Sequence, residues 1–369
     1  MVRLSLIFVV FLTSFLIRPN VGTAEELRWT QYGLRPLGMG NAFVSVADDY
    51  NALFYNPAGL ARLKEWDGEF LNPTIEVADT TISFVNDLME LGSESKNTVE
   101  VLELLQSHTG ETHHLSMYLT PHLIFKNFGF ALGLELETTL VAHSDIDIEF
   151  KFGPRIIAPI SYAQNFLNDK LSVGGTVKFL ARAGIDHSFN IDTISMLTKG
   201  DGEDSISELV EGGYAVGFDG GILFTPIKTM EPTLGISVAD IGGSVYEKAD
   251  VQGTAIGAPK TRLPSVNTGI SFKPIQTNSM YVLVASDAHA INQPVHYSQK
   301  YNLGLEWGYG KIIKIQTGLK AGYLTGGFQF DVGLLNLRFA TYTVDHAPVV
   351  GTHDALTERR FLVQIKLLI

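Results

Sequence analysis

Apolar side chains recur at every second residue along much of this 369-residue chain. In residues 128–140 one face carries phenylalanine, leucine and one threonine, whereas the other carries glycine, alanine, glutamate and threonine. Residues 301–310 and 313–323 repeat this contrast, with every charge on one face. A period of two does this in a strand but not in a helix. The pattern therefore predicts strands that separate an oily medium from a watery one.

We expect about fourteen such strands, near residues 69–77, 116–125, 128–142, 146–160, 170–183, 213–225, 232–241, 264–273, 280–288, 300–309, 312–323, 326–333, 335–344 and 360–369. Connections after odd-numbered strands are mostly long, and those after even-numbered strands are all short. Outer-membrane barrels place short turns on the periplasmic side and long loops outside. The sequence thus predicts an all-β fold, a transmembrane antiparallel β-barrel of about 14 strands over residues 69–369.

Three prolines fall inside the second and fourth of these expected strands. Pro121 lies in the second, and Pro154 and Pro159 lie in the fourth. Proline cannot donate a hydrogen bond to a ladder. Either the strands bulge or kink at these positions, or they are shorter than the alternation suggests.

The first 24 residues resemble a secretory signal. Arg3 precedes an apolar run over residues 4–17, and Gly22, Thr23 and Ala24 supply small residues for cleavage. Beyond residue 24 no apolar run of 18 residues appears, although the mean hydropathy is +0.14. Export together with distributed apolar residues predicts a bacterial outer-membrane location.

Composition excludes several function classes. The formal net charge is −12, and removal of residues 1–24 takes away two arginines and brings it to −14. Without clustered Lys and Arg, we expect no nucleic-acid binding. The absence of cysteine rules out disulfides and thiolate metal sites. We expect no cofactor, no bound metal and no enzymatic activity.

Residues 25–68 do not alternate and are rich in small side chains. Gly38, Gly40, Ala42, Ala47, Ala52, Ala58 and Gly59 would allow close approach of the backbone to another surface. Asn56 is a good helix N-cap and Pro57 suits the first helical position, so we expect a short helix from Pro57 to about Lys64.

This segment resembles the N-terminal hatch of the FadL-like outer-membrane proteins, including the related PorV-type branch. The resemblance lies in residues 38–43 (Gly-Met-Gly-Asn-Ala-Phe), 47–49 (Ala-Asp-Asp) and 55–59 (Tyr-Asn-Pro-Ala-Gly). It implies a fourteen-stranded barrel plugged by residues 25–68, and movement of hydrophobic compounds such as long-chain fatty acids. It assigns the hatch motif to Gly38, Met39, Gly40, Asp48, Asp49, Asn56, Pro57, Ala58 and Gly59.

Charged residues on the polar faces of the strands are expected to point into the lumen: Glu135, Glu137, Asp147, Glu149, Lys178, Arg182, Asp219, Lys314, Lys320 and Arg338. Two interpretations stay open for them. They could hold the hatch by ion pairs and steer solutes, or they could be ordinary water-facing lumen filler.

Two further clusters are interpreted as solvated loops. His113 and His114, with His108 and His122 nearby, lack a convincing metal-ligand spacing. Residues 201–204 (Asp-Gly-Glu-Asp) could offer oxygen ligands to calcium, but a solvated acidic loop is the simpler reading.

Residues 82–106 and 191–210 look partly helical, as an apolar capture surface or as loops that bury their own apolar faces. Two functions remain. The first is hatch-gated transport of small hydrophobic molecules, with outer-membrane lipid and the solute as partners. The second is a PorV-like barrel that docks secreted or surface proteins through its extracellular loops and moves no solute.

Overall fold

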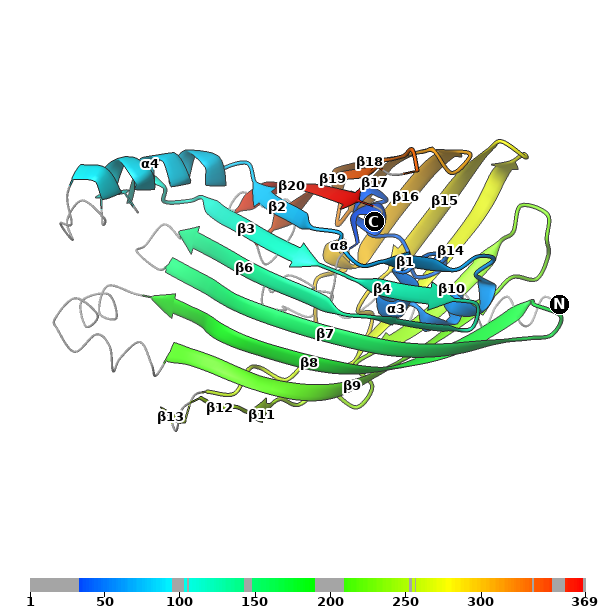
Figure 1. Ribbon diagram of the computed structural model, residues 1–369, viewed down its shortest axis with the longest axis horizontal. Coiled ribbons are helices and arrows are strands. Elements are labelled where there is room, and N and C mark those ends of the chain that lie inside the picture. The colour runs from blue at the N-terminus through cyan, green and yellow to red at the C-terminus, as the bar shows by residue number, and fades with distance from the viewer. Residues whose placement is uncertain are drawn as a thin grey trace.

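Fourteen antiparallel strands form a closed ring in the computed structural model (Figure 1). The structure describes residues 33–94, 103–104, 106–142, 148–189, 209–251, 254–255, 257–333, 335–346 and 356–367. The ring runs through β2 (Thr74–Ala78), β3 (Thr112–Leu119), β6 (Gly133–Ala142), β7 (Ile148–Phe166), β8 (Leu171–Phe189), β9 (Val210–Phe224), β10 (Thr233–Ala239), β14 (Ser265–Gln276), β15 (Met280–Ala288), β16 (Tyr301–Tyr309), β17 (Ile313–Lys320), β18 (Tyr323–Asp331), β19 (Leu335–Asp345) and β20 (Thr357–Leu367). Pairing of β20 with β2 closes it.

The predicted alternation sets the two faces of this wall. Along β16 the odd-numbered residues face outward, and the even-numbered residues from Asn302 to Gly308 are buried. Outward-facing apolar side chains continue around the ring, at Ile75, Leu136, Val177, Phe218, Ile270, Leu305, Ile315 and Val363. Such a band suits a surface that contacts lipid. The predicted barrel is confirmed.

The strands lie close to their predicted positions, and so do the connections. One end of the barrel carries short turns, such as residues 126–127, 167–170 and 310–312, and the other carries the longer connections. The expected strands leave residues 161–169 as a connection. This expectation is wrong for residues 161–166, because β7 continues to Phe166. Strand β7 is therefore long despite its two prolines, and its pairing with β8 is interrupted at Gly153 and Pro154.

The wall is broken across three neighbouring strands. Strand β1 (Asp67–Glu69) precedes β2, β4 (His122–Phe125) follows β3, and β5 (Phe128–Ala131) precedes β6. β1 pairs with β4, β4 with β5 and β5 with β7, so these pieces extend the wall toward the short-turn end. The interruptions fall at residues 70–73, 120–121 and 132. The second expected strand is thus interrupted at Pro121.

The short elements lie at the long-connection end and inside the ring. Helix α4 (Thr81–Glu94) follows β2 and agrees with the helix expected in residues 82–106. Helix α8 (Tyr297–Lys300) precedes β16. Strand β11 (Glu247–Lys248) pairs with β9, and β12 (Asp250–Val251) pairs with β13 (Thr254–Ala255). Among the described residues, no helix is both long and apolar enough to cross a membrane.

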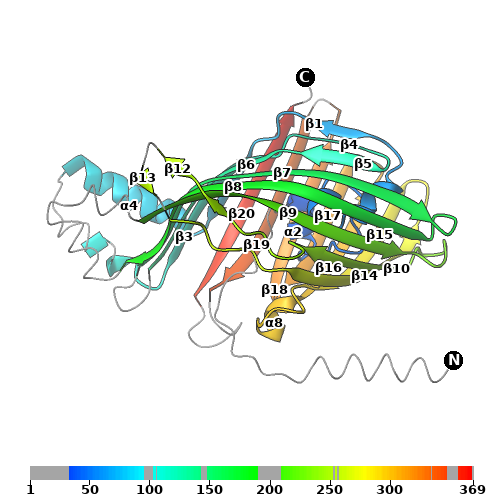
Figure 2. The same ribbon diagram turned by 90° about the horizontal axis from the view of Figure 1, so that it is seen from below.

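Residues 33–63, here called the inner segment, lie within the ring. They contain α2 (Leu34–Gly38), α3 (Ala52–Tyr55) and the 3-10 helix η1 (Pro57–Arg62). Helix α2 contacts β17, β18 and β19, whereas η1 contacts β7, β8 and β9 on other parts of the ring. Figure 2 shows α2 enclosed by strands. Residues 1–24, the expected signal, and residues 25–32 of the expected hatch lie outside the described residues.

Candidate functional site

Arg35 makes the main ionic contact between the inner segment and the wall. Its Nε and Nη2 donate to the two carboxylate oxygens of Glu306 on β16, at 2.7 and 2.8 Å. Its Nη1 donates to Asp48 at 2.6 Å and to Asp49 at 2.8 Å. Arg35 is 4% exposed and Glu306 is fully buried. Because a two-pronged guanidinium–carboxylate pair fixes orientation as well as distance, this contact positions α2 against β16.

Wall side chains also bind the backbone of the inner segment. The carboxylate of Asp287 on β15 accepts hydrogen bonds from the backbone N–H groups of Phe43 and Val44, at 2.6 and 2.7 Å. On β18, the hydroxyl of Thr325 accepts from the N–H of Gly40 at 2.9 Å. These bonds satisfy backbone donors in a segment that has little regular structure of its own.

Close packing of small residues explains the composition of the hatch motif. A Cβ atom on Gly40, which has a φ of +62°, would lie 2.2 Å from the carbonyl oxygen of Leu303. Facing glycines in the wall are equally crowded: Gly304 against Met39, Gly327 against Gly38, Gly235 against Ser45, and Gly174 against Pro57 and Ala58. The two backbones therefore touch, and a side chain on either surface would separate them.

Asn56 links the start of η1 to two strands. Its Oδ1 accepts from the N–H of Ala58 at 3.2 Å, with Pro57 at the first helical position. This confirms the expected cap, although the helix is a 3-10 helix that ends at Arg62. The Nδ2 of Asn56 lies 3.3 Å from the carbonyl oxygens of both Ile222 and Ile236. One side chain thus caps the helix and holds it to β9 and β10. Gly59 packs against Ala47, where a Cβ atom would lie 1.8 Å from the carbonyl oxygen.

A vestibule of about 1410 Å³ lies beneath the inner segment at the short-turn end of the barrel. Its lining is mixed in charge and includes Asp48 and Asp49 from the inner segment and Lys273, Lys314 and Arg338 from the wall. A smaller recess of about 220 Å³ joins Asp48, Asp49 and Lys314 to Tyr281. The motif aspartates thus lie where the inner segment meets this water-accessible space.

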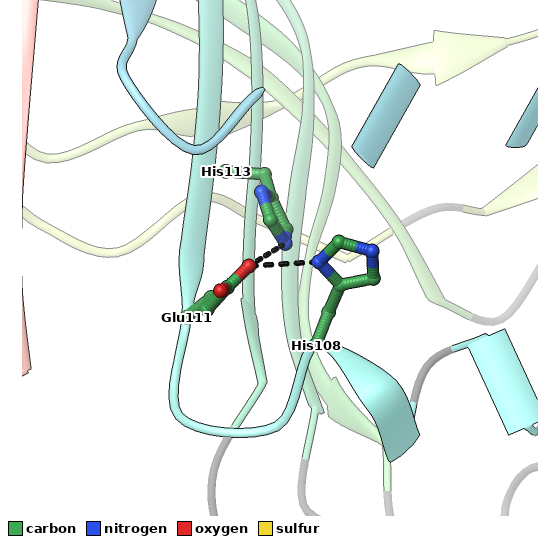
Figure 3. Close-up of side chains that lie close together, drawn as sticks. All are labelled: His108, Glu111 and His113. Carbon is green, nitrogen blue, oxygen red and sulfur yellow. Dashed lines mark hydrogen bonds and ion pairs between the residues drawn. The ribbon is translucent and has the colours of Figure 1, made fainter. Parts of the chain in front are cut away.

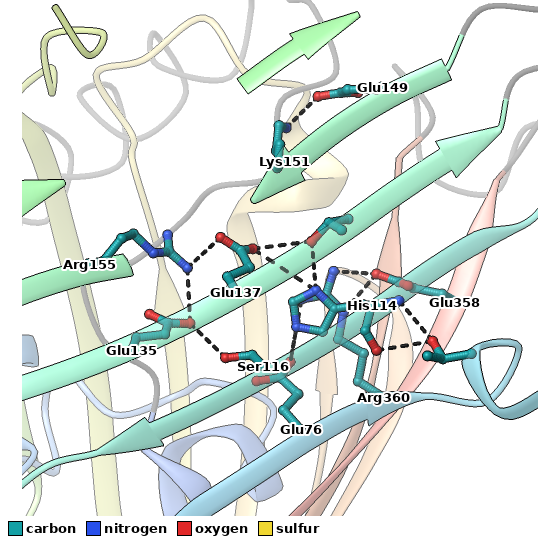
Figure 4. Close-up of polar contacts among 12 residues, drawn as sticks. Glu76, His114, Ser116, Glu135, Glu137, Glu149, Lys151, Arg155, Glu358 and Arg360 are labelled. Atoms are coloured by element: carbon teal, nitrogen blue, oxygen red, sulfur yellow. Dashed lines mark hydrogen bonds and ion pairs between the residues drawn. The ribbon is translucent and has the colours of Figure 1, made fainter. Parts of the chain in front are cut away.

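A second group of charges lies in the lumen, on the side of the inner segment that faces away from the vestibule (Figure 4). Arg155 on β7 contacts Glu135 at 3.0 Å and Glu137 at 2.7 Å. His114 lies 3.5 Å from Glu76, which Arg360 contacts at 3.4 Å. Further pairs in this group join Arg360 to Glu358 and Lys151 to Glu149. The lumen charges are therefore paired with one another across β2, β3, β6, β7 and β20.

Most of the remaining predicted lumen charges make separate contacts, whereas Lys314 lines the vestibule. Lys178 is 2% exposed and contacts Asp219 at 2.7 Å and Asp240 at 3.0 Å. Lys320 lies over the ring of Tyr342, with its Nζ 4.5 Å from the centroid. Other contacts join Arg182 to Asp186 at 2.8 Å and Arg338 to Glu69 at 2.6 Å. Asp147 and residues 201–204 lie outside the described residues.

The prediction of solvated histidines is wrong for the group around residue 113. His108, His113, His114 and His122 are all buried. Three of them lie on β3 and β4, where lumen-facing positions are covered, and the ring of His122 stacks on Tyr50 of the inner segment with 4.2 Å between centroids. His113 and His114 are buried because β3 begins at Thr112, so that they belong to a strand rather than to the long connection in which the sequence placed them.

Sequence reasoning missed the partners that hold the inner segment. Glu306 lies on the polar face of its strand, but the sequence pattern predicted no contact with the inner segment for Glu306 or for Asp287. Arg35, Asp48 and Asp49 are the only charged residues in positions 33–61, and this isolation of one cation and two anions could have suggested an ion pair.

Comparison with known proteins finds solved structures with a similar architecture. No protein-family model matches the sequence, and no curated protein matches it significantly. The structure of the Pseudomonas putida toluene transporter TodX is similar, with a TM-score of 0.50, 12% identity, and coverage of 92% of this chain and 99% of that one. The Ralstonia pickettii toluene transporter TbuX gives a TM-score of 0.50, 10% identity, and coverage of 92% and 100%. At these identities the likeness concerns the fold. The chain is thus a fourteen-stranded barrel that shares the fold of these two structures.

Proposed function

We propose that this protein moves small hydrophobic molecules across a bacterial outer membrane, with the inner segment as its hatch. The observation that carries the proposal is the placement of the inner segment directly beside the break in the wall. A barrel whose lumen is occupied offers no straight aqueous path. A solute must pass either by movement of the inner segment or through the wall.

The break and the inner segment are in contact. Tyr50 stacks on His122 of β4, and a Cβ atom on Gly129 of β5 would lie 3.1 Å from Leu53. Ile124 of β4 belongs to the same buried cluster as Tyr50 and Leu53. A displacement of residues 50–53 would therefore uncover the part of the wall in which hydrogen bonding between strands is interrupted.

A hydrophobic solute suits a lateral exit at this position. Burial of apolar surface is favourable by about 25 cal/mol per Å². A solute that leaves through the wall into the bilayer keeps that gain, whereas one released into the vestibule loses it among charged side chains. The toluene transporters with the same fold support the choice of hydrophobic solutes, and no enzymatic chemistry is needed for this role.

Uptake measurements test the transport function. Cells that lack their own channels for fatty acids and monoaromatics would be given the wild-type protein, and entry of labelled oleate and toluene would be followed. We expect faster entry of at least one of them than in cells that carry an empty vector. The proposal would be contradicted if, for both solutes, cells with the protein in their outer membrane took up no more than cells with the empty vector.

A reversible cross-link tests the hatch separately. The Ser271 hydroxyl donates to the carbonyl oxygen of Ser45 at 3.3 Å, which places a wall residue beside the inner segment. The chain has no cysteine of its own, so Ser45→Cys with Ser271→Cys creates a single pair. We expect uptake to stop under oxidation and to return with a reductant, while each single variant is insensitive. Uptake that continues in the cross-linked protein would reject hatch movement but not transport.

Protein docking is the second candidate, and helix α4 favours it. Ile82 and Met89 are each 62% exposed, and Val85 and Leu88 are also exposed. Exposed apolar side chains at a barrel rim suit contact with another protein. Affinity purification from native membranes distinguishes the two functions. Docking is favoured if a stoichiometric partner copurifies with the wild type and is lost from the variant with Ile82→Ser and Met89→Ser. It also requires that deletion of the protein leaves solute uptake unchanged.

A further inference from the structure

A cluster of two histidines and one glutamate joins the long-connection end of β3 to helix α4 (Figure 3). Ligand-type atoms of His108, Glu111 and His113 all lie within 4.8 Å of one another. His108 Nδ1 is 2.7 Å from Glu111 Oε2, and His113 Nε2 is 3.8 Å from the same oxygen. The three atoms thus converge on one point from a hairpin-like turn and the first residues of β3.

His113 presents a bare nitrogen to this point. Its Nδ1 lies 3.2 Å from the carbonyl oxygen of Thr80, which can only accept, so the ring proton belongs on Nδ1. Nε2 therefore carries a lone pair, and it is buried with no hydrogen-bond partner among the described residues, in a side chain that is 3% exposed. A buried acceptor without a donor is costly. The ring of Phe84 stacks on His113 with 4.2 Å between centroids and holds it in this orientation.

The ring of His108 is also held in a fixed orientation, by contacts on both of its nitrogens. Its Nε2 lies 3.0 Å from Asp87 Oδ2 on α4, while its Nδ1 faces Glu111. Asp87 thus fixes the orientation of the ring and leaves Nδ1 pointing at the Glu111 carboxylate. A metal ion between Nδ1 and Glu111 would take the place of the direct contact between them.

We propose that His108, Glu111 and His113 form a site for a divalent transition metal of the zinc class. Two imidazole nitrogens and one carboxylate oxygen are a known zinc ligand set, and they leave one coordination position for water. Ligands of a tetrahedral zinc ion lie roughly 3.3 Å apart, so these side chains need only small shifts to enclose it.

The outer contacts match those that support metal-bound histidines. Such rings usually donate their second N–H to a carboxylate or to a backbone carbonyl. Asp87 provides the first kind of acceptor for His108, and Thr80 provides the second for His113. Since Asp87 and Thr80 both lie in the connection that follows β2, the metal would pin α4 to the beginning of β3.

A second group of possible ligands is less suitable. Asp67, Glu69 and His122 also lie close together. Glu69, however, already contacts Arg338 at 2.6 Å and Lys366 at 3.1 Å, and Lys366 lies 4.0 Å from Asp67. Protein cations neutralise these carboxylates, whereas the described residues place no lysine or arginine in an ion pair with Glu111 or Asp87.

Titration of the full-length protein with metal alone tests the site. Protein purified in detergent and stripped with a chelator would be titrated with ZnCl2 by calorimetry and with CoCl2 by visible absorption. We expect one equivalent to bind, with a cobalt spectrum of four-coordinate type. His113→Gln and Glu111→Gln should abolish this binding, and Asp87→Asn should weaken it by about 10- to 100-fold.

His187→Gln is the matched control, because it removes a histidine elsewhere and should bind as the wild type does. All variants should keep the circular dichroism of the barrel; Glu111 is accessible enough that its amide variant should fold even if the histidine variant does not. The proposal is overturned if no stoichiometric metal binds, or if Glu111→Gln and Asp87→Asn both bind as tightly as the wild type.

Discussion

A buried pair of opposite charges, Arg35 and Glu306, lies where the inner segment meets the wall. The Arg35 guanidinium and the Glu306 carboxylate are both removed from water, and each satisfies the other. Loss of one partner leaves the other as an isolated buried charge, which is far more costly than loss of the pair. This asymmetry makes the pair a sensitive test of how the inner segment is held.

Arg35→Ala should lower the free energy of unfolding by about 3–5 kcal/mol, because Glu306 keeps its burial and loses its cation. Urea titration of the purified barrel, followed by tryptophan fluorescence, measures the change. Lys311→Ala is the control: its ion pair with Glu65 is on the surface, with Lys311 82% exposed, so stability should change by less than about 1 kcal/mol. Equal effects of the two substitutions would show that Arg35 is not buried as described.

Gly40 and Gly322 separate backbone strain from close packing. Both have positive φ angles, +62° and +88°, so alanine is strained at either position. A Cβ atom on Gly322 would meet nothing within 4 Å, whereas one on Gly40 would collide with the carbonyl oxygen of Leu303. Gly322→Ala should therefore cost only about 1–2 kcal/mol. Gly40→Ala should cost more and should make the inner segment susceptible to protease, as mass spectrometry of limited digests would show. Similar digests for both variants would argue against tight packing at Gly40.

At this scale the sequence predicts residue types better than partners. The small residues of the motif follow from the need for close backbone approach, and wall glycines alternate with outward apolar residues as expected. Arg35 and Glu306 are 271 residues apart in the chain. Periodicity identifies the face on which Glu306 lies, but it contains no information on which of many lumen positions the inner segment reaches.

At the scale of elements, alternation located the strands because each of them separates lipid from lumen over most of its length. The break could not be found in this way, since it depends on which strands are neighbours. Pro121 lies between β3 and β4, and Pro159 on β7 lies opposite the interruption at Leu132. The N–H of Leu132 donates to the carbonyl oxygen of Pro121 at 2.9 Å. Two prolines that cannot donate thus fall at one level in the wall, although they are far apart in sequence.

Restoring donors at this level should narrow the break. Pro121→Val with Pro159→Val supplies two N–H groups and two residues that favour strands. If solute leaves through the break as proposed, uptake should be slower at an unchanged amount of protein in the outer membrane, because the wall is more continuously hydrogen-bonded there. Pro154→Val on the same strand β7, away from the break, should leave uptake unchanged. Unaltered uptake in the double variant would place the exit elsewhere.

At the scale of the whole molecule, the ring and the inner segment form one core. The main buried cluster combines Phe43, Leu53 and Tyr55 of the inner segment with wall residues such as Ile157 and Leu283. Alternation predicts the ring but does not report what fills it, since a lumen-facing glycine is equally compatible with water and with a packed backbone. A hatch was predicted from a family resemblance. The contacts of residues 33–63 show how this segment is packed inside the ring, and its movement as a hatch stays a prediction.

Deletion of residues 33–63 should convert the barrel into an open pore. The strands pair with one another and close the ring without help from the inner segment, so the wall should still form. The lumen would then be lined by the glycines and charged side chains that now face the inner segment, and water and ions would enter. In planar bilayers we expect steady ion conductance from the deletion variant and little from the full chain. Arg35→Ala should give brief openings between these extremes, because it loosens the inner segment without removing it. A deletion variant that folds, as judged by circular dichroism, yet conducts no better than the full chain would mean that something other than residues 33–63 closes the lumen.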